Sequence, residues 1–271
     1  MSIFRSDKDD DRPKVTTERR GPTLVITLDR PEKRNALNSE MMFGIRDAVD
    51  SVYTDPEVRS IVIRGQGKGF SAGIDFGALA ATGILDASPS VVRKIVRVMQ
   101  DVTNLIYDIE KPVIFAIHGF CFGMAAVLIL SGDFRIAQSG TKIGIQETAV
   151  GFIPDVGGTS RLTKLIGPIK AKELIMTAKI IDAQEAQAIQ LFNDVVDDAF
   201  AGALALADTV NKNAPLAVGL AKRIINLGQP FDIRSFMDLE EVAQTILLGT
   251  QDVREGLLAK MEKRDAKFTG K

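Results

Sequence analysis

The chain has 271 residues, 45% of them apolar, with 34 Lys and Arg against 35 Asp and Glu. This composition excludes a disordered chain and provides the apolar side chains for a large core. The net charge of −1 leaves no basic face for a nucleic acid and no acidic tail. One cysteine and one histidine are too few for a zinc site or an internal disulfide, so we expect no metal and a reducing, cytoplasmic location.

Residues 1–20 are expected to form a mobile leader, because their first part, MSIFRSDKDDDRPK, carries charges where a secretory signal needs an apolar segment. The longest apolar stretch, Val113–Leu130, reaches the 18 residues of a membrane helix. His118 and Gly119 interrupt it after a β-branched segment. We therefore expect a buried strand, a turn and a buried helix there, and no membrane partner.

Strand and helix patterns alternate through residues 21–200. The expected strands are Thr23–Leu28, Ser60–Ile63, Val113–Ile117 and Phe134–Ala137, and the expected helices between them are Ser39–Thr54, Val91–Ile109 and Met124–Leu130. Such alternation is typical of a parallel sheet in an α/β fold. Helical patterns alone fill the end of the chain, so we expect an α/β core over residues 21–200 and a helical region over 201–271.

Two glycine-rich loops are candidate ligand sites. Arg64–Asp75 matches neither the dinucleotide-binding nor the P-loop spacing. Its small residues after Phe70 predict either backbone N–H groups that hold a ligand oxygen or a simple tight turn. The second loop, His118–Ala126, leads into a helix whose first N–H groups lack partners, and two such sites facing each other would form an oxyanion hole. His118 and Cys121 are interpreted as core residues, not as a nucleophile pair.

Two carboxylates, Glu147 and Asp155, lie in the nearly uncharged stretch Ile143–Ser160. A carboxyl in apolar surroundings has a raised pKa, which suits a general acid or base near neutral pH. The pattern leaves two other interpretations open: Asp155 could cap the following turn, and Glu147 could lie exposed in solvent.

Five segments in this order resemble the crotonase superfamily, the enoyl-CoA hydratase/isomerase family. They are Asp29–Asn38, Phe70–Asp75, Ala116–Gly123 with Asp133 after it, Glu147–Leu162, and Glu255-Gly256 with Lys263-Arg264. The resemblance implies an α/β fold with a ββα spiral core and a C-terminal α-helical trimerisation region. It also implies a homotrimer or a dimer of trimers that acts on an acyl-CoA thioester. Coenzyme A is then part of the substrate, and no separate cofactor is expected.

The resemblance assigns roles to individual residues. It makes the backbone N–H groups of Ala72 and Met124 the oxyanion hole for the thioester carbonyl. Met124 stands where many relatives have glycine, which predicts a narrower pocket. The residues that it places along the coenzyme A path, with the first two near the phosphates, are Lys33, Arg34, Ala36, Ala72, Gly73, Ile74, Asp75 and Gly123.

The resemblance also makes Glu147 the acid and base that forms and quenches a thioester enolate. Hydratases of the family use two glutamates, and the position of the first is Val127 here, which favours double-bond isomerisation over hydration. The spacing of Glu147 and Asp155 is similar to that in dienoyl-CoA isomerases and 3-hydroxyisobutyryl-CoA hydrolases. Hydration or thioester hydrolysis that uses Asp155 is therefore an alternative, and a non-catalytic acyl-CoA binder or an RNA-binding relative is another.

Overall fold

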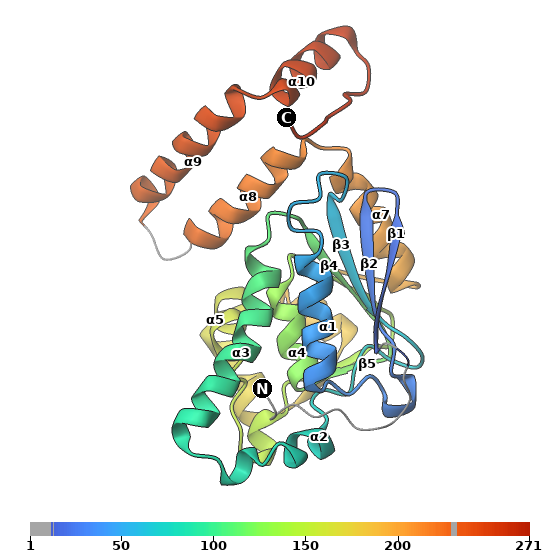
Figure 1. Ribbon diagram of the computed structural model, residues 1–271, viewed down its shortest axis with the longest axis vertical. Coiled ribbons are helices and arrows are strands. Elements are labelled where there is room, and N and C mark those ends of the chain that lie inside the picture. Colours follow the sequence, from blue (N-terminus) through green and yellow to red (C-terminus); the bar gives the residue numbers. More distant parts are fainter. Residues whose placement is uncertain (1–11, 13, 229–231) are drawn as a thin grey trace.

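A computed structural model describes residues 12, 14–228 and 232–271 (Figure 1). The strands are β1 Val15–Arg20, β2 Thr23–Leu28, β3 Ser60–Gly65, β4 Val113–Ile117, β5 Phe120–Phe122, β6 Phe134–Gln138, β7 Lys142–Gly144, β8 Ile180–Asp182 and β9 Asp194–Val196. The α-helices are α1 Ser39–Asp50, α2 Phe76–Ala81, α3 Pro89–Asp108, α4 Met124–Leu128, α5 Gly158–Thr177, α6 Ala183–Ala188, α7 Ala199–Asn211, α8 Pro215–Gly228, α9 Ile233–Leu248 and α10 Gln251–Glu262. Short 3₁₀ turns occupy Pro31–Lys33 (η1), Ile84–Asp86 (η2), Ile129–Ser131 (η3) and Glu147–Val150 (η4).

The large sheet has the strand order β1-β2-β3-β4-β6-β9, with β1 antiparallel to β2 and all later neighbours parallel. The prediction of a mobile leader through residue 20 is wrong for Val15–Arg20, which pair along their whole length with β2. These residues form an edge strand that is mostly exposed, so they need few apolar side chains and show no buried-strand pattern. Residues 1–11 and 13 of the expected leader lie outside the described residues.

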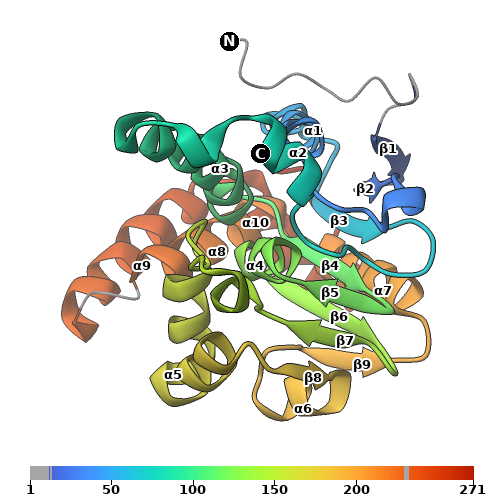
Figure 2. The same cartoon turned by 90° about the horizontal axis from the view of Figure 1, so that it is seen from below.

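Both faces of the large sheet are covered, because its parallel strands are apolar on both sides. Alternate residues of β2, β3, β4 and β6 point to one face, where Val25 and Ile114 pack on Ala203 of α7. Their neighbours point to the other face, where they form the main core with α1, α3 and α4. Figure 2 shows α7 on one side of the sheet and these three helices on the other.

The second sheet, of order β5-β7-β8, is built from three-residue strands. β5 and β7 each follow a strand of the large sheet, whereas β8 follows α5. β4 in the large sheet is followed by β5 in the small sheet and then by α4. β6 is likewise followed by β7 and then by η4 and α5. Each repeat is a ββα unit that advances one strand along both sheets, and this confirms the expected ββα spiral core.

The apolar stretch Val113–Leu130 is divided into β4, β5, α4 and part of η3. This confirms the predicted strand and helix, although the expected turn contains the short strand β5 and the α-helix ends at Leu128. Among the described residues, no helix combines the length and the apolarity that crossing a bilayer requires.

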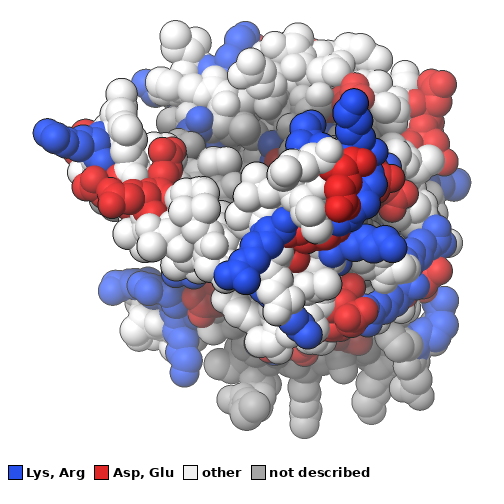
Figure 3. Space-filling model, turned by 90° about the horizontal axis from the view of Figure 1, so that it is seen from above, with Lys and Arg blue, Asp and Glu red and all other residues white. Residues whose placement is uncertain are grey.

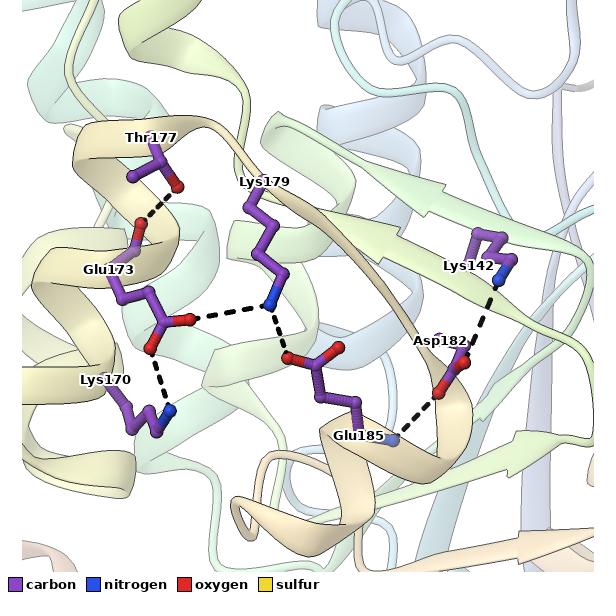
Figure 4. Close-up of polar contacts among 7 residues, drawn as sticks. All are labelled: Lys142, Lys170, Glu173, Thr177, Lys179, Asp182 and Glu185. Atoms are coloured by element: carbon purple, nitrogen blue, oxygen red, sulfur yellow. Dashed lines mark hydrogen bonds and ion pairs between the residues drawn. The ribbon is translucent and has the colours of Figure 1, made fainter.

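Ion pairs between charged side chains hold α5 and α6 beside the small sheet (Figure 4). Lys179, just after α5, contacts Glu173 of α5 at 3.5 Å and Glu185 of α6 at 2.6 Å. Lys142 of β7 lies 4.0 Å from Asp182 at the end of β8. These pairs are exposed to solvent, so they contribute little to stability and mainly orient α5 and α6.

The C-terminal helices α8, α9 and α10 extend away from the sheets (Figure 1), in agreement with the predicted helical region. Its expected start at residue 201 falls inside α7, which belongs to the core because it packs on the large sheet. Lys222 of α8 is buried and pairs with Asp133 at 2.8 Å. Burial raises the pKa of Asp133 and lowers that of Lys222, so burial favours the neutral form of each group. The opposite charge of the partner stabilises the charged form of each side chain. Acidic and basic side chains are interspersed on the face seen from above (Figure 3).

Candidate functional site

The loop that precedes α1 is fixed by one buried amide. Asn35 is fully buried, and its Nδ2 donates to the carbonyls of Gln66, Gly69 and Phe70 at 2.8, 3.1 and 3.0 Å. Its Oδ1 accepts the N–H of Arg30 at 2.9 Å. Asn35 has a φ of 53°, in the left-handed region that asparagine tolerates better than most residues. One side chain therefore holds the segment before α1 against the glycine-rich loop.

An ion pair fixes the other end of the glycine-rich loop. Arg30 Nη1 lies 2.5 Å from Asp75 Oδ2 and donates to the Ala36 carbonyl at 3.1 Å. Asp75 Oδ1 accepts the N–H of Ala78 at 3.0 Å and caps α2. Burial raises the pKa of Asp75, but the Ala78 N–H and the Arg30 guanidinium outweigh burial, so the pKa lies below its ordinary value. The carboxylate of Asp75 thus orders this loop, and its part in coenzyme A binding stays a prediction.

The backbone of the loop corrects one predicted oxyanion donor. The N–H of Ala72 donates to the carbonyl of Arg34 at 3.0 Å, so it is already used, and the prediction for Ala72 is wrong. Both neighbours of Ile74 hydrogen-bond to Leu37, at 2.7 and 2.9 Å, so the N–H of Ile74 points to the opposite side. Among the described residues no acceptor contacts this N–H. Ile74, predicted only to line the coenzyme A path, supplies the available donor.

The two predicted glycine-rich loops, Arg64–Asp75 and His118–Ala126, lie against each other. A Cβ atom placed on Gly73 would lie 2.6 Å from the Phe122 carbonyl oxygen and 3.5 Å from the Gly123 Cα. Only glycine permits this approach, and the φ of 93° at Gly73 also favours glycine. The chain next to it thereby reaches the start of α4, where Met124 is the first residue and its N–H has no helical acceptor. The N–H groups of Ile74 and Met124 are therefore the pair that this geometry offers to an oxyanion.

Glu147 lies beside this pair of donors, at the start of η4. Its Oε1 would lie 3.7 Å from a Cβ atom placed on Gly123. Its Oε2 is buried, with no hydrogen-bond partner among the described residues. Burial raises the pKa of the Glu147 carboxyl, and the negative charge of Asp155 raises it further. A carboxyl with a raised pKa and an unpaired oxygen next to two free N–H groups is suited to move a proton at a bound thioester.

Hydrogen bonds from α3 hold the loop that contains Asp155. Gln100 of α3 donates to the Asp155 carbonyl at 2.7 Å, and Thr103 donates to the Val156 carbonyl at 3.0 Å. Arg161 donates to the same Val156 carbonyl at 3.2 Å. Partial burial raises the pKa of the Asp155 carboxyl. Gly157 is the N-cap of α5, and no side chain caps that helix, so the alternative in which Asp155 caps the next turn is not what the structure has.

Val127 of α4 is fully buried. The position where a side chain on Gly158 would begin lies 2.5 Å from Pro154 Cβ and 2.8 Å from Val127 Cγ2. Val127 therefore packs against the segment that carries Asp155, and it offers neither a charge nor a hydrogen bond.

The remaining candidates are distributed around this centre. Lys33 and Arg34 are exposed, so both could reach the phosphates of coenzyme A. Their role in binding stays a prediction. His118 hydrogen-bonds the Gly67 carbonyl at 2.9 Å through Nε2. Cys121 is fully buried, and burial raises the pKa of its thiol well above the ordinary value, which does not favour a thiolate nucleophile. Among the described residues, no group of His, Cys, Asp and Glu could hold a metal ion.

Comparisons with known proteins agree with this geometry. A sequence model described as enoyl-CoA hydratase/isomerase matches residues 18–271. The chain belongs to the enoyl-CoA hydratase/isomerase family. It is 38% identical over 260 residues to the crotonyl-CoA hydratase of Syntrophomonas wolfei, covering 95% of this chain and 98% of that protein. It is 37% identical to the mitochondrial methylglutaconyl-CoA hydratase of Mus musculus, covering 93% of this chain and 81% of that protein.

Solved structures of the enoyl-CoA hydratase/isomerase family share the fold. An enoyl-CoA hydratase from Bacillus anthracis superimposes with a TM-score of 0.89 at 31% identity, covering 95% of this chain and 100% of that one. A putative enoyl-CoA hydratase from Streptomyces coelicolor gives a TM-score of 0.90 at 28% identity, covering 100% of both chains. The resemblance to the crotonase superfamily is confirmed, and with it the class of acyl-CoA enzymes.

Proposed function

We propose that the protein moves a double bond in an enoyl-CoA thioester through an enolate, with Glu147 as the only proton carrier. The observation that supports this is the buried, unpartnered Oε2 of Glu147 beside two free backbone N–H groups. Glu147 takes a proton from C2 of a 3-enoyl thioester, and the electron pair moves toward the carbonyl oxygen. The N–H groups of Ile74 and Met124 stabilise the resulting negative charge.

The protonated Glu147 then returns the proton to C4, which leaves the double bond between C2 and C3. Burial and the charge of Asp155 raise the pKa of Glu147, so the carboxyl is a better base than an exposed one and can give the proton back. No electron is gained or lost, so we propose no cofactor beyond the coenzyme A of the substrate. Val127 favours this reaction over two-glutamate hydration, because a buried valine cannot hold a water molecule.

Hydration of a 2-enoyl-CoA is the second candidate. The two relatives described above are named crotonyl-CoA hydratase and methylglutaconyl-CoA hydratase, and both match nearly the whole chain. In this chain Asp155 is the carboxylate that could position the water, since its charge already acts on Glu147. Thioester hydrolysis would use the same pair of carboxylates.

Product analysis in deuterated water distinguishes the candidates. The purified protein is incubated with 3-hexenoyl-CoA and, separately, with 2-hexenoyl-CoA, and the products are separated and weighed by mass spectrometry. Isomerisation converts the first substrate into the second without addition of water, whereas rapid hydration of 2-hexenoyl-CoA contradicts our preference. Glu147→Gln is expected to lower the rate about 10²- to 10⁴-fold. An unchanged rate in that variant would indicate that the site only binds acyl-CoA.

We also propose a homotrimer or a dimer of trimers. Apolar side chains on the last two helices are exposed in the single chain, and such surfaces mark protein contacts. They include Ile233, Met237, Val242, Ile246, Leu248, Leu257, Leu258 and Met261. Light scattering that gives the mass of one chain would contradict this assembly. The cytoplasmic location stays a prediction from the single cysteine, and the Mus musculus relative described above is named as mitochondrial.

A further inference from the structure

The guanidinium of Arg161, in the first turn of α5, joins α5 both to α3 and to the loop that carries Asp155. Its Nη1 donates to the Val156 carbonyl at 3.2 Å and to the Thr103 hydroxyl at 3.1 Å. Its Nη2 donates to Asn104 Oδ1 at 2.7 Å. These three bonds use the planar arrangement of donors on a guanidinium, which an ammonium group does not reproduce.

Two glycines let this loop fit closely between Arg161 and α4. A Cβ atom placed on Gly157 would overlap Arg161 Nη1, and the φ of 100° at Gly157 also favours glycine. On the other side, a Cβ atom placed on Gly158 would lie 2.8 Å from Val127 Cγ2 of α4. The loop is therefore packed on both sides, and the Arg161 guanidinium fills the space that a side chain at position 157 would take.

The positive charge of Arg161 does not neutralise Asp155. Among the described residues no cation pairs with the Asp155 carboxylate, and the guanidinium bonds the Val156 carbonyl and α3 instead. Asp155 lines a hollow of about 500 Å³, whose other titratable groups are Tyr107, Asp108, Arg161 and Lys164. Of these groups only Asp155 acts on Glu147: burial raises the pKa of Glu147, and the charge of Asp155 raises it further.

We propose that Arg161 is a positioning residue: it holds the Asp155 carboxylate in place, without neutralising it, so that its charge acts on Glu147. The proposal rests on the acyl-CoA function proposed above, in which Glu147 moves the proton. It distinguishes two effects of opposite sign. Loss of a positive charge alone would raise the pKa of Glu147, whereas release of the loop would let Asp155 move into the hollow and would lower that pKa.

Titration of the ligand-free protein measures this effect without a substrate. The protonated Glu147 carboxyl is followed by infrared spectroscopy, as the C=O band that Glu147→Gln abolishes. Arg161→Met and Arg161→Lys are both expected to lower the pKa of Glu147 toward its value in Asp155→Asn, because neither side chain restores the three hydrogen bonds. The acidic limb of the kcat/KM profile for 3-hexenoyl-CoA should move to lower pH in the same variants.

Gln100→Leu releases the same loop without changing any charge. Gln100 Nε2 donates to the Asp155 carbonyl at 2.7 Å, so its loss should also lower the pKa of Glu147. In an Asp155→Asn background, neither Arg161→Met nor Gln100→Leu should lower this pKa further, because the charge that they position is absent. Lys164→Met is the matched control. It removes an exposed cation one turn further along α5 and should leave the pKa of Glu147 unchanged.

Two results would overturn the proposal. A higher pKa of Glu147 in Arg161→Met would mean that Arg161 acts through its charge. An unchanged pKa in Arg161→Met and Gln100→Leu, with only the Tm lowered, would mean that the clamp is purely structural. Should Arg161→Met fail to fold, Gln100→Leu decides between these results. Failure of the parent protein to convert enoyl-CoA would overturn the proposed function instead, while the titration still tests the positioning.

Discussion

The buried amide of Asn35 gives the sharpest test of how the site is held together. Its Oδ1 accepts one hydrogen bond, and its two Nδ2 hydrogens are shared among three carbonyls. Asn35→Ala removes about three hydrogen bonds at roughly 1 kcal/mol each. The φ of 53° costs alanine about 1 kcal/mol more than asparagine. We therefore expect a loss of about 4 kcal/mol in the free energy of unfolding.

Two further substitutions separate the contributions. Asn35→Gly loses the same hydrogen bonds without the backbone cost, so it should be about 1 kcal/mol more stable than Asn35→Ala. Asn35→Asp places a carboxylate oxygen against the carbonyls that now receive N–H groups, so it should be the least stable of the three at pH 7. Asn213→Ala, an exposed control, should stay within about 0.5 kcal/mol of the parent protein.

Urea unfolding followed by circular dichroism, at one fixed protein concentration, measures these differences. A loss below about 1.5 kcal/mol in Asn35→Ala, with an unchanged denaturant slope, would refute the hydrogen-bond accounting. So would an Asn35→Asp protein as stable as Asn35→Gly, because the direction of the amide hydrogens would then have no consequence.

Other predictions concern the pH profile, the oxyanion donors and the core. Glu147 must lose its proton to act as a base, and the charge of Asp155 raises its pKa, so Asp155→Asn should move the acidic limb of the kcat/KM profile to lower pH. Replacing the Ile74 N–H by an ester oxygen should lower kcat about 10²- to 10³-fold, whereas the same exchange at Ala72 should only weaken the loop. Lys222→Met should cost about 3 kcal/mol at pH 7 in urea unfolding and less at pH 4, because acid neutralises the buried carboxylate that the lysine pairs with.

The sequence predicts those elements that have long apolar patterns. The helices expected at Ser39–Thr54 and Val91–Ile109 correspond to α1 and α3: the start of α1 agrees, and the other ends differ by one to four residues. Short strands such as β5 and β7 carry only three residues each, too few for a recognisable alternation. β1 was missed because an exposed edge strand lacks the apolar face that identifies buried strands.

The structure brings the predicted segments together, but it does not leave the N–H of Ala72 free to act as a donor. A sequence shows which loops are rich in small residues, but the direction of an N–H depends on backbone dihedrals. Gly73, with a φ of 93°, lies between Ala72 and Ile74 and separates the bonded N–H from the free one. A single glycine inside an extended run was the available signal. The structural role of Asn35 was also missed, since three of its partners are carbonyls that carry no sequence signature.

Packing links Val127 to the segment that carries Asp155. Val127 and Pro154 both lie within 3 Å of the point where a side chain on Gly158 would begin, so α4 and the segment that carries Asp155 meet through apolar atoms. A longer, charged residue at position 127 would be buried in that contact and would push the segment away. Val127 thus packs against the loop that carries Asp155, whose negative charge acts on Glu147. The two proposed reactions, isomerisation by Glu147 alone and hydration through Asp155, therefore both depend on the apolar contact between Val127 and Pro154.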